Sequence, residues 1–191
     1  MQLLEKVKNL DYNKYKDSGN LKRYYHIEGV VKMAKTLASR YGVSENKAMI
    51  AAYMHDYHKY ESDEELELLI DPKDIEECRN CPVLYHSYAS AESYKKLIGD
   101  DIDIYNAIRN HVFGRLNMSK LEEIILISDY TEEGRTYPSC IECRRLLNEG
   151  KFNKAIFEST LYTINLLYQK GLRPHARQIE VLKYYEEVKE D

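Results

Sequence analysis

The chain has 191 residues, of which 43% are hydrophobic and 31% are charged, and its formal net charge is −4. This composition is typical of a soluble globular protein of one domain, and it argues against a broad basic surface for duplex nucleic acid. No apolar run reaches the roughly 18 residues of a membrane span, and the charged start, MQLLEKVKNL, does not resemble a signal peptide. We therefore expect a cytoplasmic protein.

Apolar residues recur at helical spacing along most of the chain. The first clear segment begins after Asn20, a residue suited to an N-cap, and stops at Gly42. Ser44 is placed to open the next helix, whose small apolar residues lead into His55. These signals predict two consecutive helices separated by a short turn.

Further helix signals follow in the middle of the chain. Ser62 and Ser119 each precede a glutamate by three residues, which is the pattern of a capping box. Residues 104–111 place their apolar side chains and one histidine on a single face. Residues 121–127 are strongly apolar and predict a helix that ends near Asp129.

The C-terminal part predicts helices over residues 151–170 and 176–189. The sequence contains no convincing alternating strand pattern, no repeat and no long linker. We predict an all-α, compact and irregular fold in which residues 1–191 form a single domain. Its core spans about residues 20–135, and C-terminal helices over 138–189 pack on that core.

A set of polar residues interrupts the apolar helices. The members are His26, His55, Asp56, His86, His111 and Asp129. A buried imidazole or carboxylate needs a partner, and a single such residue is usually a hydrogen-bonded part of the core. The whole set, however, spreads ligand groups over several helices, as metal sites in helical proteins do. Mixed nitrogen and oxygen ligands favour iron, manganese, zinc or nickel over calcium or magnesium.

Helix geometry separates the residues around the adjacent pair His55-Asp56. Neighbouring helical residues lie about 100° apart, so the pair can flank one ion, or Asp56 can bridge two. If the helix continues, Lys59 falls between them one turn later, where its ammonium would meet a phosphate oxygen. His58 lies about 160° from Asp56, and we predict that it points away.

The four cysteines form two CxxC pairs, Cys78 with Cys81 and Cys140 with Cys143. Such pairs can bind a structural zinc ion, but these two are far apart in the sequence. We interpret them mainly as inert packing thiols, with a four-cysteine zinc site as the alternative. A reducing compartment disfavours a disulfide.

The candidate ligands stand in an ordered set of sequence blocks. The blocks are Arg23-Tyr-Tyr-His26, His55-Asp-Tyr-His-Lys59, His86, Ala107-Ile-Arg-Asn-His111 with Gly114-Arg115, and Ser128-Asp-Tyr-Thr-Glu-Glu-Gly-Arg135. Their H…HD…D pattern resembles that of the HD-domain metal-dependent phosphohydrolases. The full set is most similar to the YqeK-type symmetrical bis(5′-nucleosyl)-tetraphosphatases, over roughly residues 20–185.

This resemblance implies a site for two divalent metal ions, commonly iron. By position, one ion is held by His26, His55, Asp56 and Asp129, and the second by Asp56 as a bridge together with His86 and His111. The implied reaction cleaves diadenosine tetraphosphate symmetrically into two nucleoside diphosphates. Two adjacent cations would turn a bridging water into hydroxide and stabilise in-line phosphoryl transfer, with Asp56 and Lys59 as catalytic residues.

A tetraphosphate also needs cationic side chains, because it is highly anionic. The predicted substrate contacts are Arg23, Lys59, Gly114, Arg115, Arg135, Arg173 and His175. Arginine gives bidentate phosphate contacts, whereas lysine acts as a point charge. The alternative for each cation is a surface ion pair, since the chain has 32 acidic residues.

Three positions depart from the family pattern. Ile27 stands where threonine is frequent, Val112-Phe113 replace small hydroxyl residues, and Glu133-Gly134 replace Pro-Asn. None of these removes a metal ligand, but we expect Phe113 to narrow the substrate pocket.

The alternative functions belong to three classes. One is another nucleotide phosphohydrolase or phosphodiesterase of the same superfamily, and another is a nucleotide-binding sensor without turnover. The third is a zinc-organised interaction domain built on the cysteines. A small nucleotide is the expected partner, and the sequence leaves a homodimer open.

Overall fold

The computed structural model describes residues 2–190, and these form eleven α-helices and one short 3₁₀ helix with no β-strand in that range. The prediction of an all-α fold is therefore confirmed. The helices are α1 (Gln2–Asp17), α2 (Leu21–Arg40), α3 (Glu45–Met54), α4 (Asp63–Glu67), α5 (Pro72–Cys78), η1 (Pro82–Leu84), α6 (Tyr85–Leu97), α7 (Ile102–Asn110), α8 (Lys120–Thr131), α9 (Pro138–Asn148), α10 (Phe152–Gln169) and α11 (Ala176–Val188).

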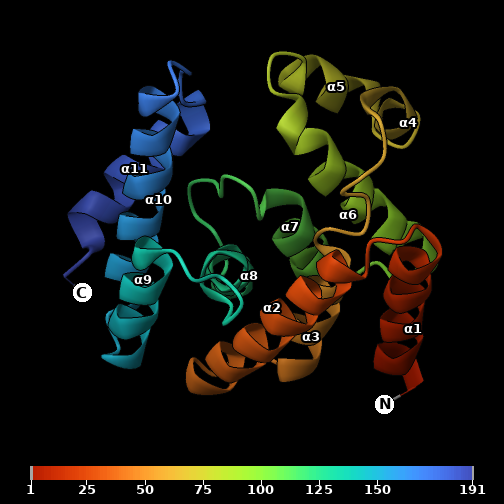
Figure 1. Ribbon diagram of the computed structural model, residues 1–191, viewed down its shortest axis with the longest axis horizontal. Coiled ribbons are helices and arrows are strands. Elements are labelled where there is room, and N and C mark those ends of the chain that lie inside the picture. Colours follow the sequence, from red (N-terminus) through yellow and green to blue (C-terminus); the bar gives the residue numbers. More distant parts are fainter. Residues whose placement is uncertain (1, 191) are drawn as a thin grey trace.

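Helix α8 lies at the centre of the fold. It contacts α2, α3 and α7 on one side and α9 and α10 on the other. Figure 1 shows α8 nearly end-on, with α9, α10 and α11 to its left and α4, α5 and α6 at the upper right. This central position fits the apolar run in the middle of α8, where Ile124, Ile125 and Ile127 are fully buried.

The main core joins residues from the N-terminal, central and C-terminal helices. Ile27 of α2, Ile108 of α7 and Ile124 of α8 are fully buried in it, and Val181 of α11 packs into the same cluster. Burying one such side chain stabilises a fold by about 1.5–3 kcal/mol. The C-terminal helices are thus held to the rest of the molecule by shared apolar burial.

Several helix ends match the sequence signals. Ser44 caps α3, and Ser62 and Ser119 form capping boxes at α4 and α8. Gly42 follows the end of α2 with φ at +68°, a conformation that favours glycine. Asn20 occupies the N-cap position of α2 but makes no side-chain capping bond, because its amide donates to Ser18 instead.

The assumption that α3 continues through Lys59 is wrong. The helix ends at Met54, and residues 55–60 form consecutive turns. Within these turns, the backbone N–H of Lys59 donates to the carbonyl of Asp56 at 3.0 Å. Bonds of this i→i−3 type tighten the backbone relative to an α-helix. His55 and Asp56 therefore sit at a helix end rather than inside a helix.

The two cysteine pairs lie in different parts of the core. Cys78 and Cys81 belong to a smaller apolar cluster built mainly from α4, α5 and α6. Cys143 lies in the main cluster, where its thiol donates to the carbonyl of Ala155. The four thiols are therefore not arranged around one shared site. In residues 2–190, no helix combines the length and apolar character needed to span a membrane.

Candidate metal centre and substrate site

The first half of the candidate centre joins α2, the end of α3 and α8. Nε2 of His26 lies 3.0 Å from Oδ1 of Asp129, and Nε2 of His55 lies 4.0 Å from the same oxygen. His55 is fully buried and Asp129 is partly exposed. Ligand atoms of these three residues all lie within 4.8 Å of one another, so a single cation can contact them together.

Asp56 connects this first group to a second one. Its Oδ2 lies 3.4 Å from Nε2 of His55, whereas its Oδ1 faces Nε2 of His86 at 3.1 Å and Nε2 of His111 at 3.5 Å. The nitrogens of His86 and His111 are themselves 3.3 Å apart. The two oxygens of one carboxylate thus point to two different sets of imidazoles, as expected for a ligand that bridges two ions.

The imidazoles are oriented by hydrogen bonds on their outer nitrogens. Nδ1 of His55 donates to the carbonyl of Ala52 at 2.6 Å, and Nδ1 of His111 donates to that of Ile108 at 2.8 Å. A carbonyl only accepts, so the ring proton is on Nδ1 and the Nε2 lone pair faces the cluster. This is the tautomer that a metal ligand requires.

His26 is oriented by Glu132, a residue that the sequence analysis missed. Oε1 of Glu132 lies 3.2 Å from Nδ1 of His26, and the carboxylate is almost fully buried. A carboxylate behind a histidine raises its basicity as a ligand. The only sequence signal for this role was the position of Glu132 inside the block that ends at Arg135.

The ionisation states favour ligation. Burial lowers the pKa of His86 to about 4, so its imidazole is neutral at physiological pH. Burial by itself raises the pKa of Asp56, but the surrounding histidines, His55 first, outweigh burial and hold that pKa well below its usual range. Asp129 behaves similarly, because His26 and other neighbours outweigh its burial.

Several buried polar atoms of the cluster have no hydrogen-bond partner in the described part of the chain. They are Nε2 of His26, Nε2 of His55 and Oδ1 of Asp56. A buried polar atom left unpaired costs about 1–3 kcal/mol. Since these atoms converge on the same space and are all metal-ligand types, the residues fit a bound cation.

Comparisons with known proteins agree with this geometry. The HD-domain family model matches residues 23–134, which is more than half of the chain. The chain belongs to the HD-domain family. A crystal structure of a Clostridium acetobutylicum protein, described as a predicted HD superfamily hydrolase involved in NAD metabolism, is 35% identical. That structure matches 97% of each chain with a TM-score of 0.85.

Two relatives share the name symmetrical bis(5′-nucleosyl)-tetraphosphatase. The one from Bacillus subtilis is 36% identical, and the match covers 78% of this chain and 81% of the relative. The one from Staphylococcus aureus is 29% identical, with 98% and 99% covered. The resemblance drawn from the sequence blocks is therefore confirmed at the level of family membership.

We call the group of His26, His55, Asp56, His86, His111 and Asp129 the HD centre. Three of the predicted phosphate contacts lie against it. Arg23 donates to Oδ2 of Asp56 at 2.8 Å, and Nζ of Lys59 lies 3.4 Å from Oδ1 of the same residue. Arg135 donates to the side chain of Asp129 at 2.7 Å and to its backbone carbonyl at 2.6 Å. Lys59 thus lies beside Asp56 through a turn rather than through a continuing helix, and its contact with a phosphate stays a prediction.

Arg115 and Gly114 do not join these cations. The guanidinium of Arg115 binds both oxygens of Glu122 at 2.7 and 2.8 Å, so it is held at the start of α8. Gly114 adopts φ +68°, and an added Cβ would lie 3.0 Å from Sδ of Met118. Both residues shape the turn after α7, and their predicted contact with a phosphate stays a prediction.

The segment before α11 is placed near α7 but not on the centre. His175 caps α11, and its ring stacks on Phe113 with 5.4 Å between ring centroids. Arg173 is exposed. His58, predicted to point away, contacts Oγ of Ser93 at 2.7 Å and Oε1 of Glu61 at 2.9 Å.

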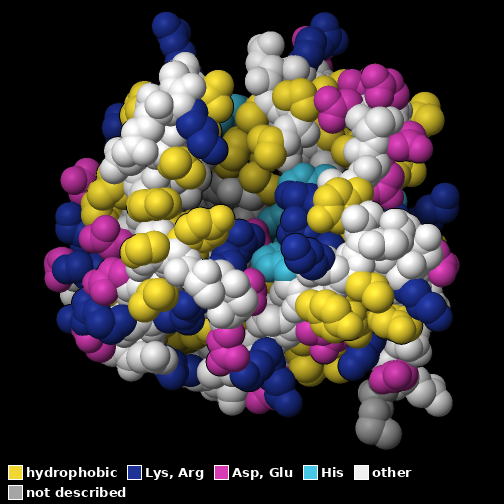
Figure 2. All heavy atoms as spheres, viewed as in Figure 1, with side chains coloured by type: hydrophobic (Ala, Val, Ile, Leu, Met, Phe, Trp, Pro, Cys, Tyr) yellow, Lys and Arg dark blue, Asp and Glu magenta, His cyan; other side chains and the backbone are white. Residues whose placement is uncertain are grey.

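Two cavities border the HD centre, and different ligands line each of them. The tyrosine-side cavity has about 380 Å³ and is lined by Arg23, His26, Tyr60, Glu132, Arg135 and Tyr137, among others. The phenylalanine-side cavity has about 80 Å³, and its lining includes His111, Phe113, Asp129, Tyr130, Ser159 and Gln178. Figure 2 shows histidines at the bottom of a hollow, with lysines and arginines around it.

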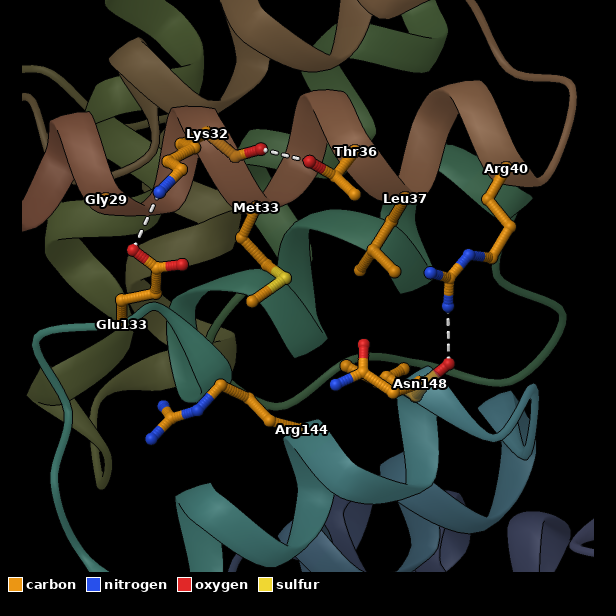
Figure 3. Close-up of a pocket in the computed structure, with 10 residues that line it drawn as sticks. Gly29, Lys32, Met33, Thr36, Leu37, Arg40, Glu133, Arg144 and Asn148 are labelled. Carbon is orange, nitrogen blue, oxygen red and sulfur yellow. Dashed lines mark hydrogen bonds and ion pairs between the residues drawn. The ribbon is translucent and has the colours of Figure 1, made fainter.

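A further groove of about 180 Å³ lies between α2 and α9, away from the cluster. Figure 3 shows Lys32 paired with Glu133, and Thr36 and Arg40 each bonded to a backbone oxygen. Lys32 pairs with Glu133 at 2.7 Å, Arg40 donates to the carbonyl of Leu147, and Arg144 donates to the carbonyl of Glu132 and others. This groove therefore lacks the unpaired buried atoms that mark the HD centre.

Proposed function

We propose that the protein is a metal-dependent hydrolase that cleaves dinucleoside tetraphosphates symmetrically into two nucleoside diphosphates. The observation that carries the proposal is the position of Asp56 between two sets of imidazoles, His55 on Oδ2 and His86 with His111 on Oδ1. The shared name of the relatives supports the choice of substrate.

The proposed cofactor is a pair of divalent ions, with iron favoured and with manganese, nickel or zinc accepted by the same ligands. His26, His55, Asp56 and Asp129 would hold one ion, and Asp56, His86 and His111 the other. A pair of ions held by these residues would acidify a bound water and offset the charge of the reacting phosphates.

The cationic side chains provide the rest of the phosphate site. Arg23 and Lys59 approach Asp56 from its two different oxygens, and Arg135 lies on Asp129. A tetraphosphate that crosses the centre would therefore meet a positive charge on each side of the cleavage point. Fixed cations at these positions stabilise the negative charge that develops on the leaving nucleoside diphosphate.

The reaction adds one water across the central phosphoanhydride. A new P–O bond forms at one of the two middle phosphorus atoms, and the bond from that atom to the bridging oxygen breaks. Each product then carries two phosphates and one nucleoside. Holding the two middle phosphates against Arg23 and Lys59 positions this bond, rather than an outer one, at the centre.

The test is product analysis on diadenosine tetraphosphate. The protein is purified under anaerobic conditions, its metal content is measured, and turnover is followed with added iron(II) or manganese(II). ADP as the only nucleotide product, with about two metal ions per chain, is the expected result. ATP together with AMP would show asymmetric cleavage, and the absence of turnover with any divalent ion would overturn the proposal.

A further inference from the structure

We propose that the tyrosine-side cavity is a nucleobase-stacking subsite, in which Tyr60 and Tyr137 hold one nucleoside of the substrate. The inference rests on the proposed function and specifies where its nucleoside binds. Tyr60 is 54% exposed and Tyr137 is 65% exposed, and both line this cavity. Aromatic rings that stay exposed beside a charged site are suited to stack on a base.

The cavity is continuous with the phosphate site. Arg23 donates to Asp56 at 2.8 Å, and its guanidinium carbon also lies 5.7 Å from the ring centroid of Tyr60. His26 and Arg135, which both contact Asp129, line the same cavity. A phosphate chain held at the HD centre therefore leads directly to the two tyrosines.

Tyr60 is held in place without being covered. Its ring makes an edge contact with the buried ring of Tyr15, at 6.2 Å between centroids. Tyr137 occupies the N-cap position of α9 but makes no capping bond with its side chain. Neither tyrosine side chain is therefore buried in the core or needed to cap a helix, so both rings are available to a ligand.

The two cavities at the centre differ in capacity. The tyrosine-side cavity has about 380 Å³, whereas the phenylalanine-side cavity has about 80 Å³ and is bordered by the Phe113 ring that stacks on His175. The tyrosine-side cavity therefore offers more room for a nucleoside than the phenylalanine-side cavity does. The two halves of a symmetrical dinucleotide would thus bind in unequal environments, with the tyrosine side contributing the stronger nucleoside contact.

The test compares ligands with and without a nucleoside. Equilibrium binding of ADP and of pyrophosphate is measured by calorimetry on metal-loaded protein, for the wild type and for Tyr60→Leu, Tyr137→Leu and the double variant. Loss of base stacking weakens binding by about tenfold per ring. We expect weaker ADP binding in each variant, an additive or larger loss in the double variant, and pyrophosphate binding within about twofold of wild type.

Two kinds of control accompany the variants. Tyr60→Phe and Tyr137→Phe keep the ring and should bind ADP as the wild type does. Tyr168→Leu replaces a tyrosine that is 58% exposed at the end of α10, outside the centre, and should change neither ligand. Equal weakening of ADP and pyrophosphate binding would mean that the tyrosines only support the phosphate site. Unchanged ADP binding would mean that they do not contact the nucleoside. Either result overturns the inference.

The design separates this inference from the proposed function. If the wild type hydrolyses diadenosine tetraphosphate to ADP and the leucine variants have an unchanged KM, the proposed function stands and the subsite is rejected. With the subsite in place, KM for that substrate rises by about tenfold or more while kcat stays within a few fold. Failure of the wild type to cleave the substrate would reject the function, and the ADP measurement would still decide the subsite.

Discussion

Two buried carboxylates of this protein, Asp56 and Glu122, are each about 1% exposed but lie in opposite surroundings. Glu122 accepts hydrogen bonds from Asn110, Arg115 and the backbone N–H of Ser119, so both of its oxygens are paired. Asp56 accepts from Arg23 on Oδ2, whereas its Oδ1 has no hydrogen-bond partner in residues 2–190 and faces Nε2 of two histidines, with Nζ of Lys59 3.4 Å away.

The difference lies in what the neighbours can donate. The donors around Glu122 occupy both of its oxygens, so the carboxylate has no oxygen free to bind a metal ion. Imidazoles whose proton is on the far nitrogen cannot donate to Asp56, so the carboxylate and the nitrogens are all electron-pair donors facing one space. A cation is the species that satisfies such a group, and the predictions below test that criterion.

The largest expected effect comes from removing the bridge. Asp56→Ala should lose the proposed second ion and lower turnover by at least about 100-fold, more than the loss of an outer partner of a ligand costs. The substitution also leaves Arg23 without its acceptor, so the melting temperature should fall as well, while the apolar core stays intact. Metal analysis, turnover and a thermal melt measure the three quantities; full activity would refute the mechanism.

Glu122→Ala should have the opposite profile. The Arg115 side chain is 38% exposed and can turn to solvent, but buried Asn110 loses its acceptor, so the variant should lose about 1–3 kcal/mol. For a chain of this size the melting temperature should fall by about 5 °C. Metal content per folded molecule should not change. Lost metal with unchanged stability would instead place Glu122 in the centre.

The sequence predicted the HD centre better than the substrate contacts, and the reason is physical. His26, His111 and Asp129 lie on or at the ends of long apolar helices, so their helical faces and chain order already determine that they converge. Arg115 lies in the turn between α7 and α8, whose path depends on a glycine with φ +68° at position 114. No periodic pattern specifies where such a turn directs a side chain.

The same limit applies to the residues that the sequence analysis missed. Glu132 follows directly after α8, and Tyr60 and Tyr137 stand in or beside turns. Their roles follow from contacts between segments far apart in the chain, such as Glu132 with His26. Lys59 was expected beside the pair on a continuing helix, whereas a turn of i→i−3 bonds brings it to Asp56, and its role toward a phosphate stays a prediction.

A third buried carboxylate, Asp11 of α1, sharpens the comparison. It is fully buried, and within residues 2–190 neither of its oxygens has a hydrogen-bond partner. Burial, followed by the charges of Asp56 and Glu28, raises its pKa from 3.8 to about 8. No ligand nitrogens surround Asp11 in the described part of the chain. Its carboxyl avoids a buried charge by staying protonated rather than by binding a cation.

Asp11→Asn should therefore change the pH dependence of stability. The folded carboxyl stays protonated up to about pH 8, whereas the unfolded one ionises above about pH 4. The wild type thus loses stability as pH rises from 4 to 8, and the asparagine variant avoids this loss. Denaturant unfolding of metal-stripped protein should show similar stabilities at pH 4 and a more stable variant, by on the order of 5 kcal/mol, at pH 9. An equal difference at both pH values would show that Asp11 does not titrate in this range.

The smallest effect on turnover is expected from His58, which differs from the ligand histidines in having both ring nitrogens engaged. Nε2 contacts Ser93 and Nδ1 contacts Glu61. His58→Ala should cost about 1–2 kcal/mol of stability through these lost bonds, while turnover per folded molecule stays within about twofold of wild type.

His86→Ala is the matched control, because it removes a similarly buried imidazole whose Nε2 faces Asp56 at 3.1 Å. It should lose turnover with little change in melting temperature. If both variants lost turnover alike, the pairing of the ring nitrogens would not distinguish a structural histidine from a ligand, and the assignment of the centre would have to rest on residue type alone.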